Sequence, residues 1–323
     1  MCRMKRRFAV LTLLLMGTAA AAQTKFPEGP IKMVVPFAAG GGVDSAARLL
    51  AKQLGTNLNV PVVVENKPGA NGSVGGKFVQ MANADGLTLL FSASTHALAK
   101  QVMATAPYDP QTDFAAVARV GEAPLMMVIS PGLPQTKLPE VIAAAKQSPD
   151  KWTAALPALG AASHLGTLMF AKQGNLPNLV TAVYKGTAPA LTDVAGGHVQ
   201  IQIDAIIAMQ GMAKAGKVKP IMVTSAKRSS VMPNVPTAVE SGYPKFVTES
   251  WYGVWAPKAT PADRVQLINK AINEAVQQLT KAGAWEPLGI EPVTESSEDF
   301  RKYMATYVIE SADLLKGAGF KPE

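Results

Sequence analysis

Three consecutive glycines, Gly40–Gly42, separate an apolar run from a helical pattern that begins near Asp44. Glycine lacks a Cβ atom, so the backbone of such a loop can adopt a positive φ and approach a ligand closely. The first turn of the following helix presents unpaired N–H groups and the positive end of the helix dipole. The segment predicts a site for a carboxylate or phosphate, although a tight turn with nothing bound is equally consistent with it.

Nucleotide-binding loops are the familiar alternatives, and the sequence fits neither common type. A dinucleotide fingerprint requires a third glycine at the position of Ser45. A phosphate-binding Walker loop requires Ser or Thr after a Gly-Lys pair, but Phe78 follows Gly76 and Lys77. We therefore interpret the turn-rich segment 66–73 as a loop that braces the first glycine turn.

Hydroxyl side chains follow the third strand-like run, Leu87–Ser92. Ser92, Ser94 and Thr95 are expected at the same sheet edge as the glycine loop, either in contact with a ligand or in a structural role. Ser94 with a histidine base would instead make the chain a secreted serine hydrolase. Neither a Gly-x-Ser-x-Gly elbow nor a Ser-x-x-Lys pair surrounds these residues, which argues against a nucleophile.

The second half of the chain offers two further candidates for ligand contact. Ala161, Ala162 and Ser163 lie in a small-residue loop that enters a helix, which predicts a second anion-binding N-terminus. Asp204 follows the apolar run Val199–Ile203. Its carboxylate is expected to accept a hydrogen bond from a ligand or water, or to cap the next helix.

Histidine and cysteine are too sparse to form a recognisable metal or redox motif. His96, His164 and His198 are far apart and lack nearby acidic partners. Cys2 is the only cysteine and lies in the leader described below, so the mature chain has no thiol. We expect no metal and no cofactor.

The first 22 residues have the three-part pattern of a cleavable secretory signal. Four cations within residues 3–7 precede the apolar stretch Phe8–Met16, and three alanines ending at Ala22 precede Gln23. A membrane anchor is the alternative, but the apolar stretch is shorter than the ~20 residues of a spanning helix. We expect cleavage near Ala22 and a mature chain in the periplasm.

Cleavage also changes the apparent charge of the chain. The formal net charge is +8 for the full sequence, and loss of the four leader cations reduces it to +4. Lys and Arg are scattered through the remainder, and aromatic residues make up only 6% of the chain. Because a base-stacking platform needs aromatic side chains among clustered cations, we expect no nucleic-acid partner.

Strand-like and helical segments alternate along the chain, which predicts an α/β fold with mostly parallel sheets. Removal of 22 residues from 323 leaves 301, which at ~150 residues per domain predicts two domains. We place them at residues 23–125 plus 250–323 and at residues 126–249, joined by a hinge of two crossovers. The expected strands are Ile31–Val35, Val60–Val64, Leu87–Ser92, Leu125–Ile129, Thr153–Leu156, Leu179–Tyr184, Val199–Ile203, Pro220–Ser225 and Trp251–Trp255.

Several blocks in a fixed order resemble the solute receptors of tripartite tricarboxylate transporters, also called the Bug family. The resemblance spans essentially the whole mature length, and the succession of blocks is far more specific than any one of them. Val43 departs from the family, which often has Thr there, and the loop 159–162 is less polar than usual. The blocks are Ile31–Arg48, Val64–Gly72, Asp85–Leu90, Pro107–Phe114, Tyr184–Gly197 and Trp251–Gly253.

The resemblance implies a two-lobed periplasmic-binding-protein architecture of the type II, or flytrap, kind, with two mixed sheets. It implies a receptor that is not an enzyme, captures a small carboxylate between its lobes and delivers it to a membrane permease. The solute is expected to be a dicarboxylate, a tricarboxylate, an amino-acid-like acid or an aromatic acid, and the receptor a monomer. A periplasmic sensor partner that binds the same kind of solute is the alternative role.

The family's binding positions carry over onto this sequence one at a time. The expected mechanism is that backbone N–H groups of the two loops hold the carboxylate, that Phe37 forms an apolar wall, and that lobe closure excludes water. The implied ligand-binding residues are Phe37, Ala39, Gly40, Gly41, Ser92, Ser94, Thr95, Ala161, Ala162, Ser163 and Asp204.

Overall fold

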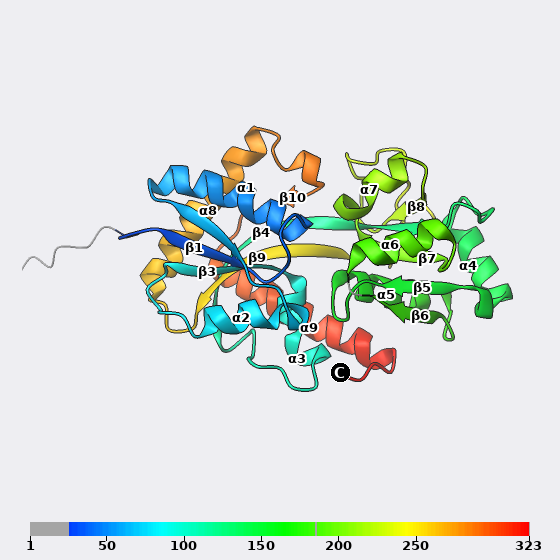
Figure 1. Cartoon of the computed structure of the whole chain (residues 1–323), viewed down its shortest axis with the longest axis horizontal. Coiled ribbons are helices and arrows are strands. Elements are labelled where there is room, and N and C mark those ends of the chain that lie inside the picture. The colour runs from blue at the N-terminus through cyan, green and yellow to red at the C-terminus, as the bar shows by residue number, and fades with distance from the viewer. Residues whose placement is uncertain (1–25, 185, 323) are drawn as a thin grey trace, which may run out of the picture.

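A computed structural model describes residues 26–184 and 186–322, and these residues form two lobes (Figure 1). The predicted signal peptide lies outside the described residues. The two-lobed α/β architecture predicted for the chain is confirmed. Within the described ranges, no helix has the length and apolar character needed to cross a membrane.

The sheet of the first lobe joins parallel and antiparallel strands in the order β2-β1-β3-β9-β4, with β10 paired to β4. Pairing of β1 with β2 and β3 is parallel, whereas β9 is antiparallel to both of its neighbours. The strands are β1 (Ile31–Val35), β2 (Val62–Asn66), β3 (Thr88–Ala93), β4 (Phe114–Ile129), β9 (Glu249–Pro257) and β10 (Glu291–Pro292).

The sheet of the second lobe shares strand β4 with the first. It continues from β4 in the order β7-β5-β6, and β8 also pairs with β4. The β5 pairings with β6 and β7 are parallel, and both pairings of β4 in this lobe are antiparallel. The remaining strands are β5 (Thr153–Leu156), β6 (Val180–Val183), β7 (Ile201–Ala205) and β8 (Lys219–Val223).

Helices cover both faces of each sheet (Figure 1). In the first lobe, α1 and α8 pack on one face, and α2 and α9 pack on the other. Short 3-10 turns include η1 (Ala70–Gly72) and η2 (Ser94–Leu98). The helices are α1 (Gly42–Leu58), α2 (Ser73–Gln80), α3 (Ala99–Val102), α4 (Leu138–Gln147), α5 (Ala162–Gly174), α6 (Thr187–Gly196), α7 (Ile206–Lys214), α8 (Ala262–Lys281) and α9 (Ser297–Gly317).

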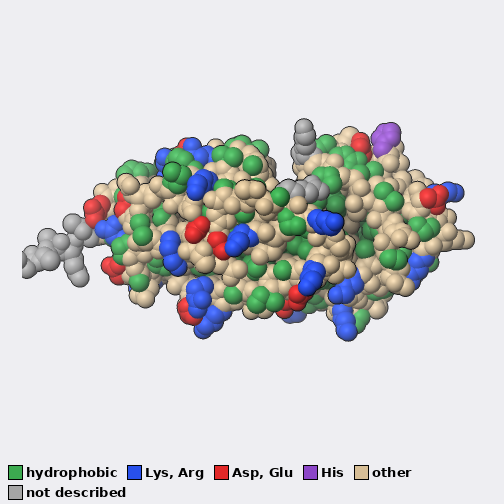
Figure 2. All heavy atoms as spheres, turned by 90° about the horizontal axis from the view of Figure 1, so that it is seen from below, with side chains coloured by type: hydrophobic (Ala, Val, Ile, Leu, Met, Phe, Trp, Pro, Cys, Tyr) green, Lys and Arg blue, Asp and Glu red, His purple; other side chains and the backbone are tan. Residues whose placement is uncertain are grey.

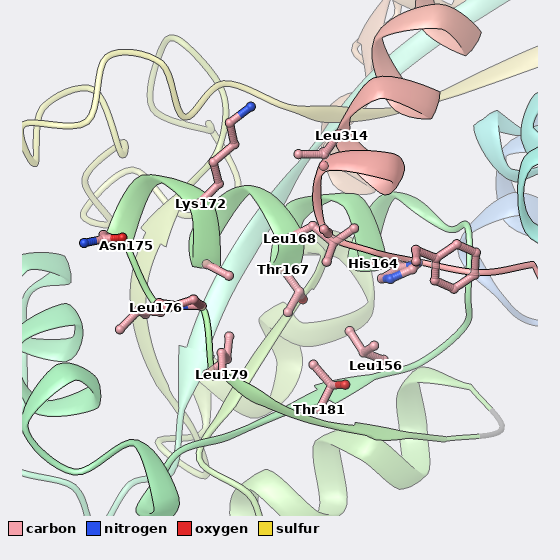
Figure 3. A pocket seen from close by; sticks show the side chains of 15 residues that line it. Leu156, His164, Thr167, Leu168, Lys172, Asn175, Leu176, Leu179, Thr181 and Leu314 are labelled. Carbon is pink, nitrogen blue, oxygen red and sulfur yellow. The ribbon is translucent and has the colours of Figure 1, made fainter.

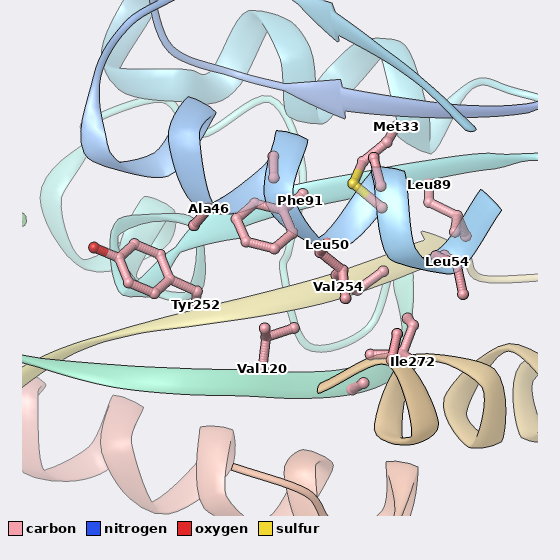
Figure 4. Packing of buried hydrophobic residues seen from close by; sticks show 14 of the residues in the cluster. Met33, Ala46, Leu50, Leu54, Leu89, Phe91, Val120, Tyr252, Val254 and Ile272 are labelled. Atoms are coloured by element: carbon pink, nitrogen blue, oxygen red, sulfur yellow. The ribbon is translucent and has the colours of Figure 1, made fainter. Parts of the chain in front are cut away.

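The core of the first lobe is a continuous apolar layer between the sheet and helices α1 and α8 (Figure 4). Leu50 and Leu54 of α1 are fully buried against Phe91 and Val254 of the sheet and Ile272 of α8. Their helical spacing turns both leucines to one side, so each contributes about 1.5–3 kcal/mol by leaving water.

The chain passes between the lobes along β4 and returns along β9. Strand β4 pairs with β9 up to Pro124 and with β7 and β8 from Leu125 onward. At this point the backbone N–H of Leu125 donates to the hydroxyl oxygen of Thr224 at 2.9 Å, and that hydroxyl donates to the carbonyl oxygen of Thr248. Thr224 therefore ties the outgoing segment to the returning one, beside the proposed domain limits.

Strand β4 is much longer than the sequence predicted, because it begins at Phe114 and not at Leu125. Its first part contains two register shifts against β9, near Ala116–Ala118 and Arg119–Gly121. Such irregularities break the simple alternation of side chains by which a strand is recognised.

On the face shown in Figure 2, Lys and Arg side chains are dispersed among Asp and Glu.

Candidate functional site

A cavity of about 240 Å³ lies between the two lobes. Asp204 is the one charged side chain among the described residues that line it, and the other polar groups are mainly hydroxyls. The lining residues are Phe37, Gly42, Val43, Ala93, Thr95, Leu125, Pro157, Ala158, Ala161, Ala162, Ser163, Gly186, Thr187, Asp204, Ala205, Ile207, Ala208, Ser250 and Tyr252.

Four helices begin at this cavity. Residues at the first turns of α1, α5, α6 and α7 line it, starting from Gly42, Ala162, Thr187 and Ile206. The residue before each helix provides no side-chain cap, so the first-turn N–H groups have no such partner. Because each N-terminus carries a partial positive charge, their convergence creates a positive potential without a buried cation.

The first glycine loop is braced by a polar network centred on Asp44. Its carboxylate accepts hydrogen bonds from Gly40 N–H (2.9 Å), Arg48 Nε (2.9 Å) and Asn66 Nδ2 (2.9 Å). Asn66 also donates to the carbonyl oxygen of Phe37 at 3.0 Å. Burial opposes ionisation, but these hydrogen bonds outweigh it and lower the pKa of Asp44. The prediction that segment 66–73 braces this loop is confirmed through Asn66.

From this loop, Phe37, Gly42 and Val43 line the cavity. Phe37 lines the cavity, but Ala39, Gly40 and Gly41 are exposed and lie outside its lining. The N–H group of Gly40 is already used by the Asp44 carboxylate. Gly42 is the glycine of this loop that lies against the opposite lobe, since a Cβ atom there would lie 3.1 Å from Ile207.

The second predicted loop lies at the cavity as expected. Ala161, Ala162 and Ser163 line the cavity, and the buried hydroxyl of Ser163 has no hydrogen-bond partner among the described residues. Gly160, with φ of +69°, donates its N–H to Nδ1 of His164 at 3.1 Å. Burial lowers the pKa of His164 to about 4, so the ring is neutral at pH 7 and its Nδ1 can accept.

The two lobes touch on both sides of the cavity. Gly42 lies against Ile207, and Gly160 lies against Val102, whose Cγ1 would be only 2.5 Å from a Cβ atom at Gly160. Glycine at both positions lets the lobes approach closely. The structure is therefore a closed arrangement in which the cavity has walls from both lobes.

Asp204 lines the cavity with both carboxylate oxygens already paired. Ala205 N–H donates to Oδ1 at 2.8 Å, and the Thr187 hydroxyl donates to Oδ2. Burial nevertheless raises the pKa of Asp204 above its ordinary value. Burial also raises the pKa of Tyr252, and the negative charge of Asp204 adds to that effect.

The sequence interpretation missed Gly186 and Thr187 as site residues. A glycine directly before a helical pattern is the signal that singled out Gly40–Gly42, and it is present at Gly186 as well. Gly186 has φ of 116°, a conformation that strongly favours glycine. Applying the same rule to both loops would have found this third helix N-terminus.

The structure places the three predicted hydroxyl residues at the end of β3 and just after it in different environments. Thr95 lines the cavity, whereas Ser92 and Ser94 are buried outside its lining. Side chains alternate along a strand, so Ala93 faces the cavity and Ser92 faces the opposite side of the sheet. The hydroxyls of Ser92 and Ser94 are buried and lack hydrogen-bond partners among the described residues.

The arrangement gives no support to a serine hydrolase. His96 Nδ1 lies 3.2 Å from the Tyr108 hydroxyl, and burial lowers the pKa of the ring to about 3. His164 Nδ1 is occupied by Gly160 N–H. Over residues 26–184 and 186–322, no serine hydroxyl is hydrogen-bonded to a histidine, and no three His, Cys, Asp or Glu side chains group as metal ligands.

Comparison with known proteins identifies related chains of the same length. A sequence profile described as "Tripartite tricarboxylate transporter family receptor" matches residues 46–320. Protein BugT of Bordetella pertussis (strain Tohama I) is 36% identical over 324 residues, which cover 98% of this chain and 99% of that protein.

Solved structures with the same fold include two that contain a dicarboxylate. The R. palustris protein Rpa4515 with adipate is 30% identical, has a TM-score of 0.85, and is matched over 92% of this chain and 100% of its own. MatC from Rhodopseudomonas palustris with bound malate is 28% identical, has a TM-score of 0.79, and is matched over 90% and 100%.

Proposed function

Because this chain belongs to the tripartite tricarboxylate transporter receptor family, we propose that it is a periplasmic receptor that closes on a small dicarboxylate and delivers it to a membrane permease. The convergence of four helix N-termini on the cavity between the lobes carries the proposal. The adipate and malate bound by two relatives belong to the proposed solute class.

The electrostatics of the cavity suit an anion with more than one carboxylate. A helix N-terminus is equivalent to about half a positive elementary charge. Four of them together present roughly two charges of the sign needed to balance a dicarboxylate. Within each lobe the backbone dipoles are fixed in place before the solute arrives, so binding requires only that the lobes close to bring the two sets together.

The size and lining of the cavity restrict the solute to a short acid. Its volume of about 240 Å³ lies below the range of about 300–1,000 Å³ typical of pockets for drug-sized ligands. Phe37, Leu125 and Ile207 supply apolar wall. In the proposed complex these side chains cover the carbon chain between the two carboxylates.

Individual site residues have distinct proposed roles. The first-turn N–H groups of α1 and α5, together with the Ser163 hydroxyl, donate to one carboxylate. Thr187 and Asp204 act as a pair from the opposite side, where the carboxyl group of Asp204, when protonated, can donate to the second carboxylate. One chain provides all these groups, so the proposed receptor works as a monomer.

Closure follows from contacts that a solute makes with both lobes. A ligand shifts a conformational equilibrium only by its difference in affinity for the two states. A dicarboxylate held by α1 on one lobe and by α5–α7 on the other binds the closed state more tightly than the open state, because separation of the lobes removes one set of contacts. The proposed permease then receives the solute from this closed form.

A ligand screen on the purified chain tests the proposal. Succinate, malate, adipate, citrate, aspartate and benzoate are compared by thermal unfolding and calorimetry, with the corresponding amides as neutral controls. A bound acid at ~100 times its dissociation constant should add ~2.7 kcal/mol to the free energy of unfolding. If no acid stabilises the protein, or if the amides act equally well, the carboxylate receptor is the wrong function.

A further inference from the structure

A second and larger cavity, of about 550 Å³, lies away from the cleft between the lobes (Figure 3). Helix α5, the segment that leads into the edge strand β6, and the end of α9 form its walls. Helix α9 belongs to the first lobe and α5 to the second, so both lobes contribute to it. The proposed function makes no use of this cavity.

The walls present apolar and polar surface in similar amounts. The apolar lining is provided by Leu156, Leu168, Leu176, Leu179, Leu314 and Phe320. Among the described lining residues, Lys172 is the one Lys or Arg side chain, and none is Asp or Glu. A carboxylate on an apolar ligand would therefore not be repelled by a negatively charged side chain in this wall.

His164 supplies a directed hydrogen-bond donor in this wall. The residue is 3% exposed, and its ring lies at the cavity beside Phe320 (Figure 3). Because Gly160 N–H donates to Nδ1 at 3.1 Å, Nδ1 carries no proton. The ring is neutral at pH 7, so its single proton lies on Nε2.

The Nε2–H group has no acceptor among the described residues. Unlike Nε2 of His96, this atom is not sealed from solvent, so water in the cavity can accept from it. A ligand oxygen that enters the cavity would take the place of that water, while the apolar part of the ligand displaces water from the leucine side chains.

We propose that this cavity is a second binding site, for an amphipathic organic acid whose carboxylate accepts from His164 Nε2–H and whose hydrocarbon chain lies along the leucines. The site shares none of the cleft's lining residues and stands independently of the proposed function. Its ligand differs from the solute of the cleft in having one acidic end and one apolar end.

Histidine-selective nitrogen NMR tests this site, because the sequence contains only three histidines. Octanoate is titrated into protein labelled with ¹⁵N-histidine, and acetate serves as a control with the same carboxylate and no chain. We expect octanoate to shift the His164 Nε2 resonance in a saturable manner, whereas His198, which is exposed and does not line the cavity, stays unchanged. Acetate should have no effect at the same concentration.

Two variants fill the cavity without touching His164. Ala171→Phe adds volume from the partly exposed side of α5, and Thr181→Trp adds it from the exposed strand β6. Either should weaken octanoate binding at least about tenfold, a change of about 1.4 kcal/mol. Thr181→Trp provides the test if Ala171→Phe does not fold.

A third variant separates this site from the cleft. Thr187→Val alters the cleft without adding a group between the lobes, and should leave the octanoate dissociation constant measured at His164 unchanged. An unchanged His164 signal at millimolar octanoate would overturn the proposal. So would a response that survives in both cavity-filling variants or changes its dissociation constant in Thr187→Val, because octanoate would then act from the cleft.

Discussion

The side-chain amide of Asn71 donates to the carbonyl oxygen of Leu159 over 2.9 Å, and this hydrogen bond joins the two lobes next to the cavity-lining loop 161–163. Asn71 lies in η1, where Ala70 and Asn71 both have positive φ, of 43° and 54°. Alanine rarely adopts this conformation, which is unfavourable by about 1–2 kcal/mol. The strained turn therefore presents an amide to the other lobe, which favours a role in closure.

Replacement of Asn71 by Asp tests that role. Asp is close in size and tolerates positive φ, but an ionised carboxylate cannot donate to Leu159 and repels its carbonyl oxygen. Loss of one hydrogen bond of about 0.5–1.5 kcal/mol should raise the dissociation rate of the solute about twofold to tenfold. Stopped-flow tryptophan fluorescence of the solute complex measures this rate.

Asn59→Asp is the matched control for this experiment. Asn59 also has a positive φ, of 54°, but it ends helix α1. It does not line the cleft. Equal effects of the two substitutions would show that Asn71 contributes only to local stability and not to closure.

Gly42 is expected to be the position in the glycine loop least tolerant of a side chain. A valine there would meet Ile207 of the opposite lobe, and overpacking of this kind typically costs about 1–3 kcal/mol. Gly42→Val should therefore reduce solute affinity about tenfold to a hundredfold in calorimetry. Gly41→Val is the control, because a Cβ atom at Gly41 has an ordinary distance of 3.6 Å to its nearest neighbour.

Local patterns predicted the parts of the site that depend on neighbouring residues. The helical spacing of Leu50 and Leu54 identified the buried side of α1, and a small-residue loop identified the start of α5 near Ala162. The bracing role of Asn66 was also evident from the turn-rich segment around it. These features follow from backbone preferences over a few residues.

Local patterns could not predict which face of a strand a given residue occupies. They also could not predict contacts between residues that are far apart in the sequence. Ser92 and Ala93 differ by one residue, and only the position of the strand in the sheet decides which one faces the cavity. Asn71 and Leu159 are 88 residues apart and meet only because the lobes are closed. No local pattern contains that information.

Thr187 is predicted to control the charge of Asp204. Thr187→Val keeps the shape of the side chain but removes the hydroxyl that donates to the carboxylate. Loss of this hydrogen bond makes the buried charge less favourable and should raise the pKa of Asp204 further. Because the protonated carboxyl group of Asp204 is the form that donates to the solute, affinity at neutral pH should increase, by up to about tenfold in calorimetry. In the control Thr192→Val, the lost hydroxyl bonds only within α6, so affinity should stay unchanged.

The lobe connection also contains a carboxylate held in an unfavourable environment. Glu249 opens strand β9 opposite Pro124 of β4. Burial, a hydrogen bond with Glu122, and the negative charges of Glu122 and Glu291 raise the pKa of Glu249 to about 7, although Arg119 acts in the opposite direction. Side chains from α9 that border the same depression include Tyr303, Tyr307 and Glu310.

This shift predicts how stability depends on pH. Between the ordinary pKa of 4.5 and the folded value of about 7, the folded state binds more protons at Glu249 than the unfolded state does. The free energy of unfolding contributed by this group therefore falls as pH rises through that window and is constant above it. Glu249→Gln removes this dependence. Its effect on the free energy of unfolding should therefore be more stabilising at pH 8 than at pH 5, by on the order of 2 kcal/mol. Urea unfolding at both pH values measures the difference, with the exposed Glu286→Gln as control. Equal effects of Glu249→Gln at the two pH values would mean that the carboxyl group titrates normally in the folded protein.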